Sequence, residues 1–364
     1  MRTLSDARGP APSVGPLAHL AVRGSHREIG RQIGEATRDI VHATIAHYVD
    51  AYPRIAGLTF AQAEIQAQVY LAKAAEHMPQ FVAELRGIAE GADVEVMPLL
   101  VLHCGEEFTA EADVRPHAVG CTAVGVSDGG RHVVGHNMDW YAADVDKNVI
   151  LDMTLPDGTR IVTVHGAPYL PILGVSSHGF AYVGNSVPST DNQVGVPNMF
   201  VRRWVLEARS LAEAQERACF TARARGSNHF LGHADGTLLT LETSATADAV
   251  IHGQGHLAHT NHYVAAKMHK YGAAPAQESL DRLARAERLL AEGPATGEDA
   301  IDLVARVLRD HAHAPESICG HPQDSLPAAE RIMTVHSMIC DLDERRVYVR
   351  SGSPCEGPYQ CIQL

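Results

Sequence analysis

The sequence predicts an α+β protein, with helices before a set of strands and further helices between them. Helical periodicity dominates the first third of the 364 residues, and the pattern changes to strands at Gly120. Two more helical stretches follow, near residues 280–291 and 298–310. Because strands and helices are grouped rather than regularly alternating, a layered α+β sheet fold is favoured over a βαβ protein.

The N-terminal third carries two clear helical patterns. Residues 27–52 place isoleucines and other apolar residues mostly three or four positions apart, which predicts one amphipathic helix. A second pattern, over residues 81–88, runs toward Gly91, and a glycine there suits a helix stop. We therefore expect residues 1–120 to form a mostly helical part.

Strand patterns begin at Cys121. Residues 121–127 and 131–137 are apolar or alternating, and Asp128-Gly129-Gly130 between them is typical of a turn, so a β-hairpin is predicted. A second turn-joined pair surrounds Ala234-Asp235-Gly236. The further predicted strands cover residues 161–165, 180–185, 229–233, 237–242 and 347–350.

Composition narrows the classes of partner. A formal charge of −13 disfavours nucleic acid and anionic membranes, which require clustered Lys and Arg, so a small-molecule partner is expected. No stretch is long and apolar enough to span a bilayer, and Met1 to Leu20 contains Pro and Gly where a signal peptide needs an apolar block. A cytoplasmic protein is the resulting expectation.

Histidines are unusually many, but neither they nor the cysteines form a recognised ligand motif. The seven cysteines contain no CxxC pair, so neither a disulfide framework nor a zinc ribbon is expected. The 22 histidines include close pairs such as His259/His262 and His311/His313, and Cys319 lies two residues before His321, but no HExxH motif is present. We interpret them as scattered residues and predict no metal site.

The first hairpin gathers chemically useful side chains. With the turn centred on Gly129, antiparallel pairing places Cys121 opposite Asn137, and Asp139 lies two residues farther along. Side chains alternate with a period of two, so these three should share one face, with His136 and Met138 on the other. The alternative is a buried cysteine and an Asn-x-Asp that caps a turn. Gly120 favours the catalytic interpretation, because glycine tolerates strained conformations at a scissile peptide.

The segment GCTAVGVSDGGRHVVGHNMDW resembles the processing site of the isopenicillin N acyltransferase family of N-terminal-nucleophile hydrolases. The Gly-Cys junction and the G-x-N-x-D-W ending carry this likeness. Similar blocks extend over nearly the whole chain, and they are GRQIG at 30–34, ELRGIAEGADV at 84–94, GFAYVGNSV at 179–187, NHFLGHADGTLLTLETS at 228–244, HTNHY at 259–263, SICGH at 317–321 and GSPCEGPY at 352–359.

The resemblance implies a four-layer αββα sandwich and self-cleavage between Gly120 and Cys121. The small chain, residues 1–120, would be released or retained, and residues 121–364 would form the catalytic large chain. Cys121 would attack the Gly120 carbonyl, and its freed amino group, with a reference pKa of about 7.7 to 8.0, would then serve as base. Asn261 would donate to the oxyanion, and Asp139 would orient the amine or assist processing.

Three weaker assignments also come from the resemblance. Ser244 matches a serine near the nucleophile, Arg331 an active-site arginine and Asn185 a pocket residue, although each also suits a structural role. Gly320 departs from the family pattern, in which a basic residue usually stands between the cysteine and the histidine.

The expected activity is therefore cleavage or transfer of an acyl group from a small-molecule amide or thioester through acyl-Cys121. Water would complete a hydrolase cycle and an amine acceptor a transferase cycle, and the sequence leaves this choice open. No cofactor is expected, although an acyl-CoA would be a co-substrate of a transferase. The alternative is a non-catalytic relative, or a ligand- or metal-binding protein, that retains the fold.

Overall fold

The computed structural model describes residues 16–111 and 120–364. The leader before residue 16 and residues 112–119, which precede the predicted cleavage site, lie outside the described residues. The described chain forms one eight-stranded and one six-stranded sheet. The larger sheet has the order β1-β4-β5-β6-β7-β8-β9-β10, with bounds β1 (His19–Arg23), β4 (Asn148–Thr154), β5 (Arg160–Gly166), β6 (Gly174–Ser176), β7 (Phe180–Ser186), β8 (Ser227–His233), β9 (Leu238–Thr243) and β10 (Asp248–His252).

The smaller sheet has the order β11-β2-β3-β12-β13-β14 and contains the predicted hairpin at its centre. Its strands are β2 (Cys121–Asp128), β3 (Arg131–Tyr141), β11 (His256–His259), β12 (Ile332–Asp341), β13 (Arg346–Ser351) and β14 (Gln360–Gln363). Neighbouring strands pair antiparallel in both sheets, except that β1 pairs parallel with β4.

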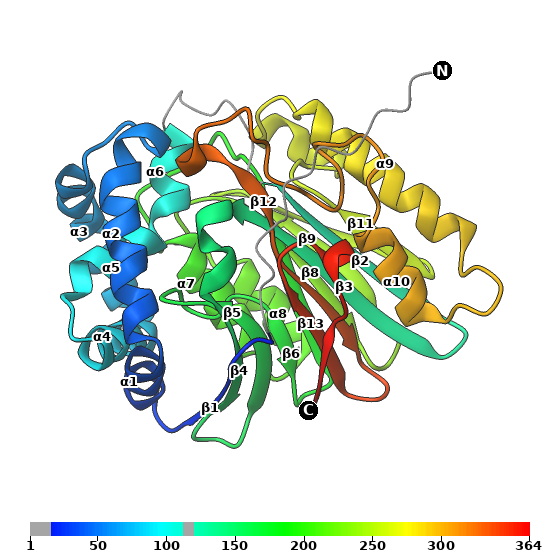
Figure 1. Cartoon of the computed structure of the whole chain (residues 1–364), viewed down its shortest axis with the longest axis horizontal. Coiled ribbons are helices and arrows are strands. Elements are labelled where there is room, and N and C mark those ends of the chain that lie inside the picture. Colours follow the sequence, from blue (N-terminus) through cyan, green and yellow to red (C-terminus); the bar gives the residue numbers. More distant parts are fainter. Residues whose placement is uncertain (1–15, 112–119) are drawn as a thin grey trace.

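Helices cover the outer faces of both sheets (Figure 1). The α-helices are α1 (His26–Ala36), α2 (Arg38–Ile55), α3 (Phe60–His77), α4 (Pro79–Ala92), α5 (Val96–His103), α6 (Gly105–Glu111), α7 (Asn198–Leu206), α8 (Leu211–Ala218), α9 (Gln277–Glu292) and α10 (Ala300–Leu308). Residues 16–111 and 120–364 also contain four short 3-10 helices, namely η1 (Ala142–Lys147), η2 (Ala266–Tyr271), η3 (Ala328–Glu330) and η4 (Pro354–Glu356). None of these helices combines the length and apolar character needed to cross a bilayer.

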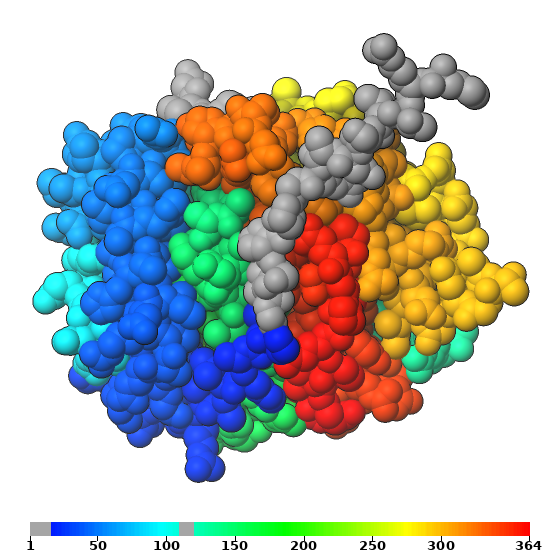
Figure 2. Space-filling model, viewed as in Figure 1, coloured from blue at the N-terminus to red at the C-terminus, as the bar shows by residue number. Residues whose placement is uncertain are grey.

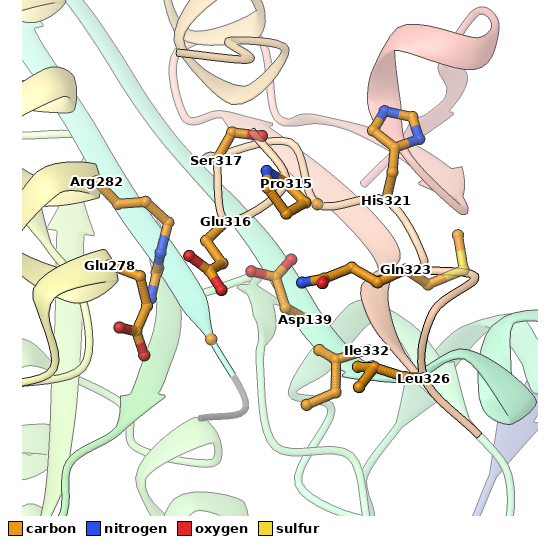
Figure 3. A pocket seen from close by; sticks show the side chains of 13 residues that line it. Asp139, Glu278, Arg282, Pro315, Glu316, Ser317, His321, Gln323, Leu326 and Ile332 are labelled. Atoms are coloured by element: carbon orange, nitrogen blue, oxygen red, sulfur yellow. The ribbon is translucent and has the colours of Figure 1, made fainter. Parts of the chain in front are cut away.

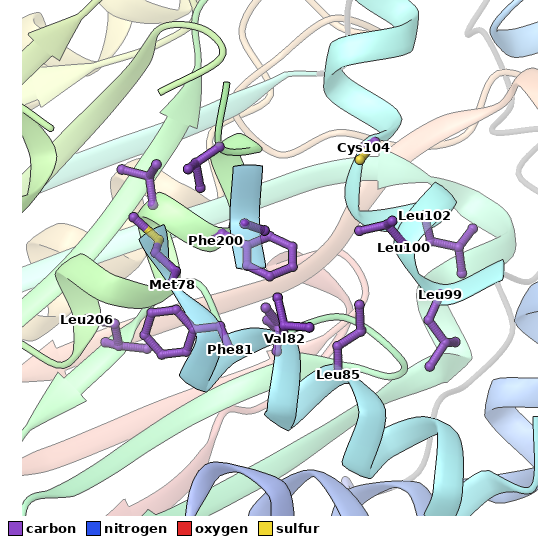
Figure 4. Packing of buried hydrophobic residues seen from close by; sticks show 14 of the residues in the cluster. Met78, Phe81, Val82, Leu85, Leu99, Leu100, Leu102, Cys104, Phe200 and Leu206 are labelled. Carbon is purple, nitrogen blue, oxygen red and sulfur yellow. The ribbon is translucent and has the colours of Figure 1, made fainter. Parts of the chain in front are cut away.

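The three largest apolar clusters of the described residues lie between the layers of the fold. One lies between the sheets and includes Val134 and Phe230, while a second joins α9 and α10 to the outer face of the smaller sheet. The largest core packs the N-terminal helices and α7 on the larger sheet, and Figure 4 shows Phe81 and Leu85 of α4 near Phe200 of α7. Figure 2 shows the blue N-terminal segment and the yellow α9 segment on opposite sides of the molecule. The predicted α+β fold with αββα layers is therefore confirmed.

The prediction of a single helix over residues 27–52 is wrong in one respect. The helix is divided at Thr37 into α1 and α2. The backbone of Thr37 leaves helical geometry (φ −119°, ψ 22°), and its hydroxyl donates to the Ile33 carbonyl at 2.8 Å. A threonine hydroxyl competes in this way for carbonyls at helix ends. The chain therefore forms α1 and α2 with different directions rather than one rod.

Candidate active site

The hairpin forms as predicted, but its predicted register is wrong by one residue. Asp128 pairs with Arg131, which leaves a two-residue loop of Gly129 (φ 60°) and Gly130 (φ 77°). Positive φ at both positions is the geometry of the tight turn that suits a twisted hairpin. A shift of one residue transfers a side chain to the other face of the sheet. Cys121 consequently pairs with Met138, and Thr122 with Asn137.

The new register separates the thiol from Asn137 and Asp139. The Cys121 sulfur lies 3.6 Å from the Met138 sulfur, on the face toward the larger sheet. The buried Asn137 amide instead donates to the carbonyls of Leu308 and Ile318, each at 2.8 Å. Asn137 therefore ties β3 to the end of α10 and to the loop that follows it.

Asp139 nevertheless lies beside the predicted scissile peptide. Its backbone N–H donates to the Gly120 carbonyl at 3.0 Å. A Cβ atom at Gly120 would lie only 3.0 Å from both Asp139 Oδ2 and Arg282 Nη2. The site thus gives a steric reason for glycine before Cys121, because a larger residue would crowd a carboxyl and a guanidinium group.

The Cys121 nitrogen is held by Asn261, which follows β11. The Cys121 N–H donates to Asn261 Oδ1 at 2.8 Å, and Asn261 Nδ2 donates to the Ser186 carbonyl at 2.9 Å. Arg282 donates to the same Asn261 oxygen at 2.9 Å and to the Cys121 carbonyl at 2.7 Å. Two donors thus converge on Asn261 Oδ1, so its oxygen rather than its nitrogen faces the nucleophile.

The Cys121 thiol lines a cavity between the two sheets. Apolar side chains, including Leu170, Leu173 and Met199, form much of its wall, and Arg202 contributes a cation. Arg202 donates to the Gly184 carbonyl at 2.9 Å, while its buried Nε has no partner among the described residues. This cavity offers apolar room for an acyl chain beside a single arginine side chain.

Burial governs the ionisation of the central groups. It raises the pKa of the Cys121 thiol to about 12, Asp139 adds to the rise, and the positive charges of Arg202 and Arg282 oppose it. Burial also raises the pKa of Asp139 to about 7, against the opposing effects of Arg282 and of a 2.6 Å hydrogen bond from Thr334. In the uncut chain, therefore, the thiol is neutral near pH 7 and requires a base.

A second pocket lies on the other side of the Gly120–Cys121 peptide. Figure 3 shows Asp139 at its centre, with Arg282 on one side and Gln323 on the other. Gly120 lines this pocket, and the Cys121 thiol lines the first one. A Cβ atom at Gly320 would lie 3.5 Å from Asp139 Oδ1, so the basic residue typical of the family at this position would project toward Asp139.

The other predicted site residues have contacts away from Cys121. Asn185 is buried and donates to the His259 and Thr260 carbonyls, each at 2.8 Å, so it braces the segment that presents Asn261. Ser244 donates to Asp191 at 2.8 Å in a turn. Arg331 pairs with Asp324 at 3.0 Å and donates to the Leu326 carbonyl.

Sequence reasoning missed Arg282 and Arg202, although one signal was available. The buried positions of α9 are 279, 282, 283, 286, 289 and 290, which is the spacing of an inward helix face. An arginine at 282 therefore occupies a position where the periodicity predicts an apolar residue. Such a buried charge requires polar partners, and these are the Cys121 carbonyl and Asn261.

The fold and the site define an αββα protein with a buried thiol at the start of a central strand. Residues 126–356 match the sequence model of the family described as acyl-coenzyme A:6-aminopenicillanic acid acyl-transferase. The chain belongs to this family, as its sequence motifs indicated.

One relative is similar in sequence over most of the chain. It is 26% identical over 351 residues to the 40 kDa form of acyl-coenzyme A:6-aminopenicillanic-acid-acyltransferase from Emericella nidulans, covering 93% of each chain. Solved structures similar to it include a variant of conjugated bile acid hydrolase from Clostridium perfringens (12% identity, TM-score 0.48, 67% of this chain and 92% of that one). Another is penicillin V acylase from Agrobacterium tumefaciens (15% identity, TM-score 0.44, 67% and 86%).

Proposed function

We propose that this protein is a self-cleaving cysteine enzyme that hydrolyses or transfers an acyl group of a small-molecule amide or thioester through acyl-Cys121. One observation carries the proposal: the Gly120–Cys121 peptide is held at both ends. The Asp139 N–H binds its carbonyl oxygen, and Asn261 Oδ1 accepts from its nitrogen. Membership of an acyl-transferase family supports the same activity.

Self-cleavage would begin with attack of the Cys121 sulfur on the Gly120 carbonyl carbon. The Asp139 N–H is placed to stabilise the negative charge that develops on the oxygen. The C–N bond then breaks, the nitrogen takes the proton that the thiol has lost, and a thioester joins Gly120 to Cys121. One water molecule hydrolyses this thioester to a Gly120 carboxylate and a free thiol, and the new amino group remains beside Asn261.

In the second reaction the freed amino group would take the thiol proton, and the sulfur would attack a substrate acyl carbon. Asn261 then orients the amine through its side-chain oxygen, a role that its two incoming donors favour over oxyanion donation. Arg202, whose side chain lines the cavity, is our candidate oxyanion donor. The acyl-enzyme is resolved by water in a hydrolase or by an amine in a transferase.

Intact-mass measurement of purified protein tests the proposal. Wild-type protein should give two chains, residues 1–120 and 121–364, and Cys121→Ala should give one. Cys340→Ala, which alters another buried strand cysteine, should be cut normally. An uncut wild-type chain whose Cys121 does not react with thiol reagents would show that the protein is a non-catalytic relative.

A panel of acyl donors, including acyl-CoA thioesters and amides, then separates the two activities. The cut enzyme is incubated with each donor in the presence and absence of primary amines, and the products are quantified. Acylated amine in excess of free acid identifies a transferase. Free acid alone, at a rate that added amine does not change, identifies a hydrolase.

A further inference from the structure

Four potential metal ligands meet near the second pocket. Within the described residues, the ring nitrogens of His311 and His321 and the sulfurs of Cys319 and Cys355 all lie within 4.8 Å of one another. His321 Nε2 lies 3.1 Å from His311 Nε2, 3.8 Å from the Cys319 sulfur and 3.3 Å from the Cys355 sulfur. Two imidazoles and two thiols therefore surround one point.

The spacing fits a tetrahedral ion. Zn–N bonds of about 2.0 to 2.1 Å and Zn–S bonds of about 2.3 Å place tetrahedral ligands roughly 3.3 to 3.8 Å apart. The distances from His321 to the two sulfurs, 3.3 and 3.8 Å, lie in this range, and the 3.1 Å distance to His311 is slightly shorter. Thiolate and imidazole ligands in this combination select zinc over the hard cations Mg²⁺ and Ca²⁺.

The surroundings of the four side chains suit ligation. His321 Nδ1 lies 3.3 Å from Glu356 Oε1, so a carboxylate can fix the ring while Nε2 faces the ion. Cys319 is buried, whereas His311 and Cys355 are exposed, so an ion can enter from solvent. His321 lies at the edge of the second pocket, with its ring directed away from Asp139 (Figure 3).

We propose that His311, Cys319, His321 and Cys355 bind one Zn²⁺ ion, with release of the two thiol protons to solvent. Three ligands come from the segment that follows α10 and the fourth, Cys355, comes from η4, so an ion would join two segments that are separate in sequence. That separation is why no sequence motif revealed the site. The histidines predicted to be scattered thus include two, His311 and His321, that meet in a four-ligand cluster.

The ion would also fix the backbone beside the candidate active site. Gly320 lies between two of the ligands, and its N–H donates to Thr334 Oγ1 at 2.9 Å. Thr334 in turn donates to Asp139 at 2.6 Å. The Ser353 hydroxyl donates to the Gly320 carbonyl at 2.8 Å, which links the C-terminal segment to the same point. We therefore assign the ion a positioning role, with no step in the acyl reaction.

The test measures metal content and Zn²⁺ affinity of the full chain purified under reducing conditions. Wild-type protein should bind one Zn²⁺ per chain, and Co²⁺ substitution should give a thiolate-to-metal absorption band. The exposed ligands are the better targets, because their replacement disturbs folding least. His311→Ala and Cys355→Ser should weaken Zn²⁺ binding at least tenfold, and Glu356→Gln by about tenfold.

His313→Ala and Cys361→Ser are matched controls outside the cluster and should bind Zn²⁺ as the wild type does. Cys121→Ala should also bind normally, so the result does not depend on self-cleavage. Any of three results would overturn the proposal. These are less than one Zn²⁺ per chain in the wild type, wild-type Zn²⁺ affinity in both His311→Ala and Cys355→Ser, and a Cys319–Cys355 disulfide in the reduced preparation.

Discussion

Arg282 connects the two residues on which the candidate site depends. It is 4% exposed and donates to the Cys121 carbonyl, to Thr122 and to Asn261. Replacing it by methionine keeps much of the volume but leaves these acceptors without their donor. We expect Arg282→Met to slow self-cleavage about 100-fold, because misplacement of reacting groups by about 1 Å has effects of that size. A time course of the two-chain fraction measures the rate.

Arg285→Met is the matched control for Arg282. Arg285 lies one helical turn farther along α9 and pairs with Asp310, on the partly buried side of the helix. This variant should be cut at the wild-type rate. Equal slowing in both variants, with equal loss of thermal stability, would mean that α9 packing rather than the Arg282 contacts sets the rate.

The raised pKa of Asp139 predicts an unusual dependence of stability on pH. A carboxyl group whose folded pKa is about 7, above its ordinary value near 3.8, favours folding while protonated. That contribution is complete below about pH 4 and is lost as pH rises through about 7. We compare the free energies of unfolding of Cys121→Ala proteins with aspartate or asparagine at position 139. As pH rises from about 4 to 7, the asparagine variant should become more stable relative to the aspartate protein by on the order of a few kcal/mol.

Urea unfolding at several pH values measures this difference in free energy. Asp157→Asn serves as a control, because hydrogen bonds donated by Thr159 lower the pKa of Asp157 to about 2. Its contribution is lost only as pH falls toward 2, so its effect should be constant between about pH 5 and 8. A constant effect of Asp139→Asn over the same interval would contradict a raised pKa.

At the scale of elements, the sequence predicted the central hairpin but not its pairing. The alternation of apolar and polar residues predicts two strands, and the turn residues between them predict that the strands pair. The register of the pairing depends on whether the loop has two or three residues, and Asp128-Gly129-Gly130 is compatible with both lengths. Arg282 illustrates a second limit. Its contacts span 161 residues in sequence, and local patterns carry no information on such contacts.

Helices α1 and α4 pack closely through glycines that the sequence shows as GRQIG and GIAEG. A Cβ atom at Gly34 would lie 2.2 Å from the Ile88 carbonyl oxygen, and one at Gly91 would lie 2.2 Å from that of Arg31. Alanine has the higher helix propensity, by about 1 kcal/mol. Here the clash should dominate, so Gly34→Ala and Gly91→Ala should each destabilise the protein by about 1 to 3 kcal/mol.

Thermal unfolding of the Gly34→Ala and Gly91→Ala variants tests this prediction, because the clash lowers the melting temperature whereas helix propensity alone would raise it. Gly105→Ala is the control, because the nearest atom to a Cβ there is the Tyr52 hydroxyl at 3.9 Å. It should leave the melting temperature unchanged or raise it slightly. A higher melting temperature for Gly34→Ala would show that the two helices can separate without cost.

At the scale of the whole molecule, residues before Cys121 form part of the same fold as those after it. Strand β1 adds to the larger sheet through β4, and Tyr48 of α2 donates to Asp144, which lines the thiol cavity, at 2.6 Å. The largest apolar core also contains residues from both sides of the proposed cut. We therefore expect the two chains to remain associated after cleavage and to elute together in gel filtration.

A buried ion network across this boundary gives the association its sharpest test. Arg203 of α7 pairs with Glu84 of α4 at 3.0 Å and with Glu207 at 2.7 Å, and Arg203 and Glu84 are fully buried. Arg203→Met would leave the buried Glu84 without its cation, which should cost about 3 to 5 kcal/mol, whereas Glu207 keeps its 2.9 Å contact with His26. The two chains of the variant should thus separate at a lower urea concentration than those of the wild type.

Arg209→Met is the control, because it breaks an exposed pair with Asp157. It should change the free energy of unfolding by less than about 1 kcal/mol. Equal midpoints for Arg203→Met and wild type would show that apolar packing alone holds the chains together.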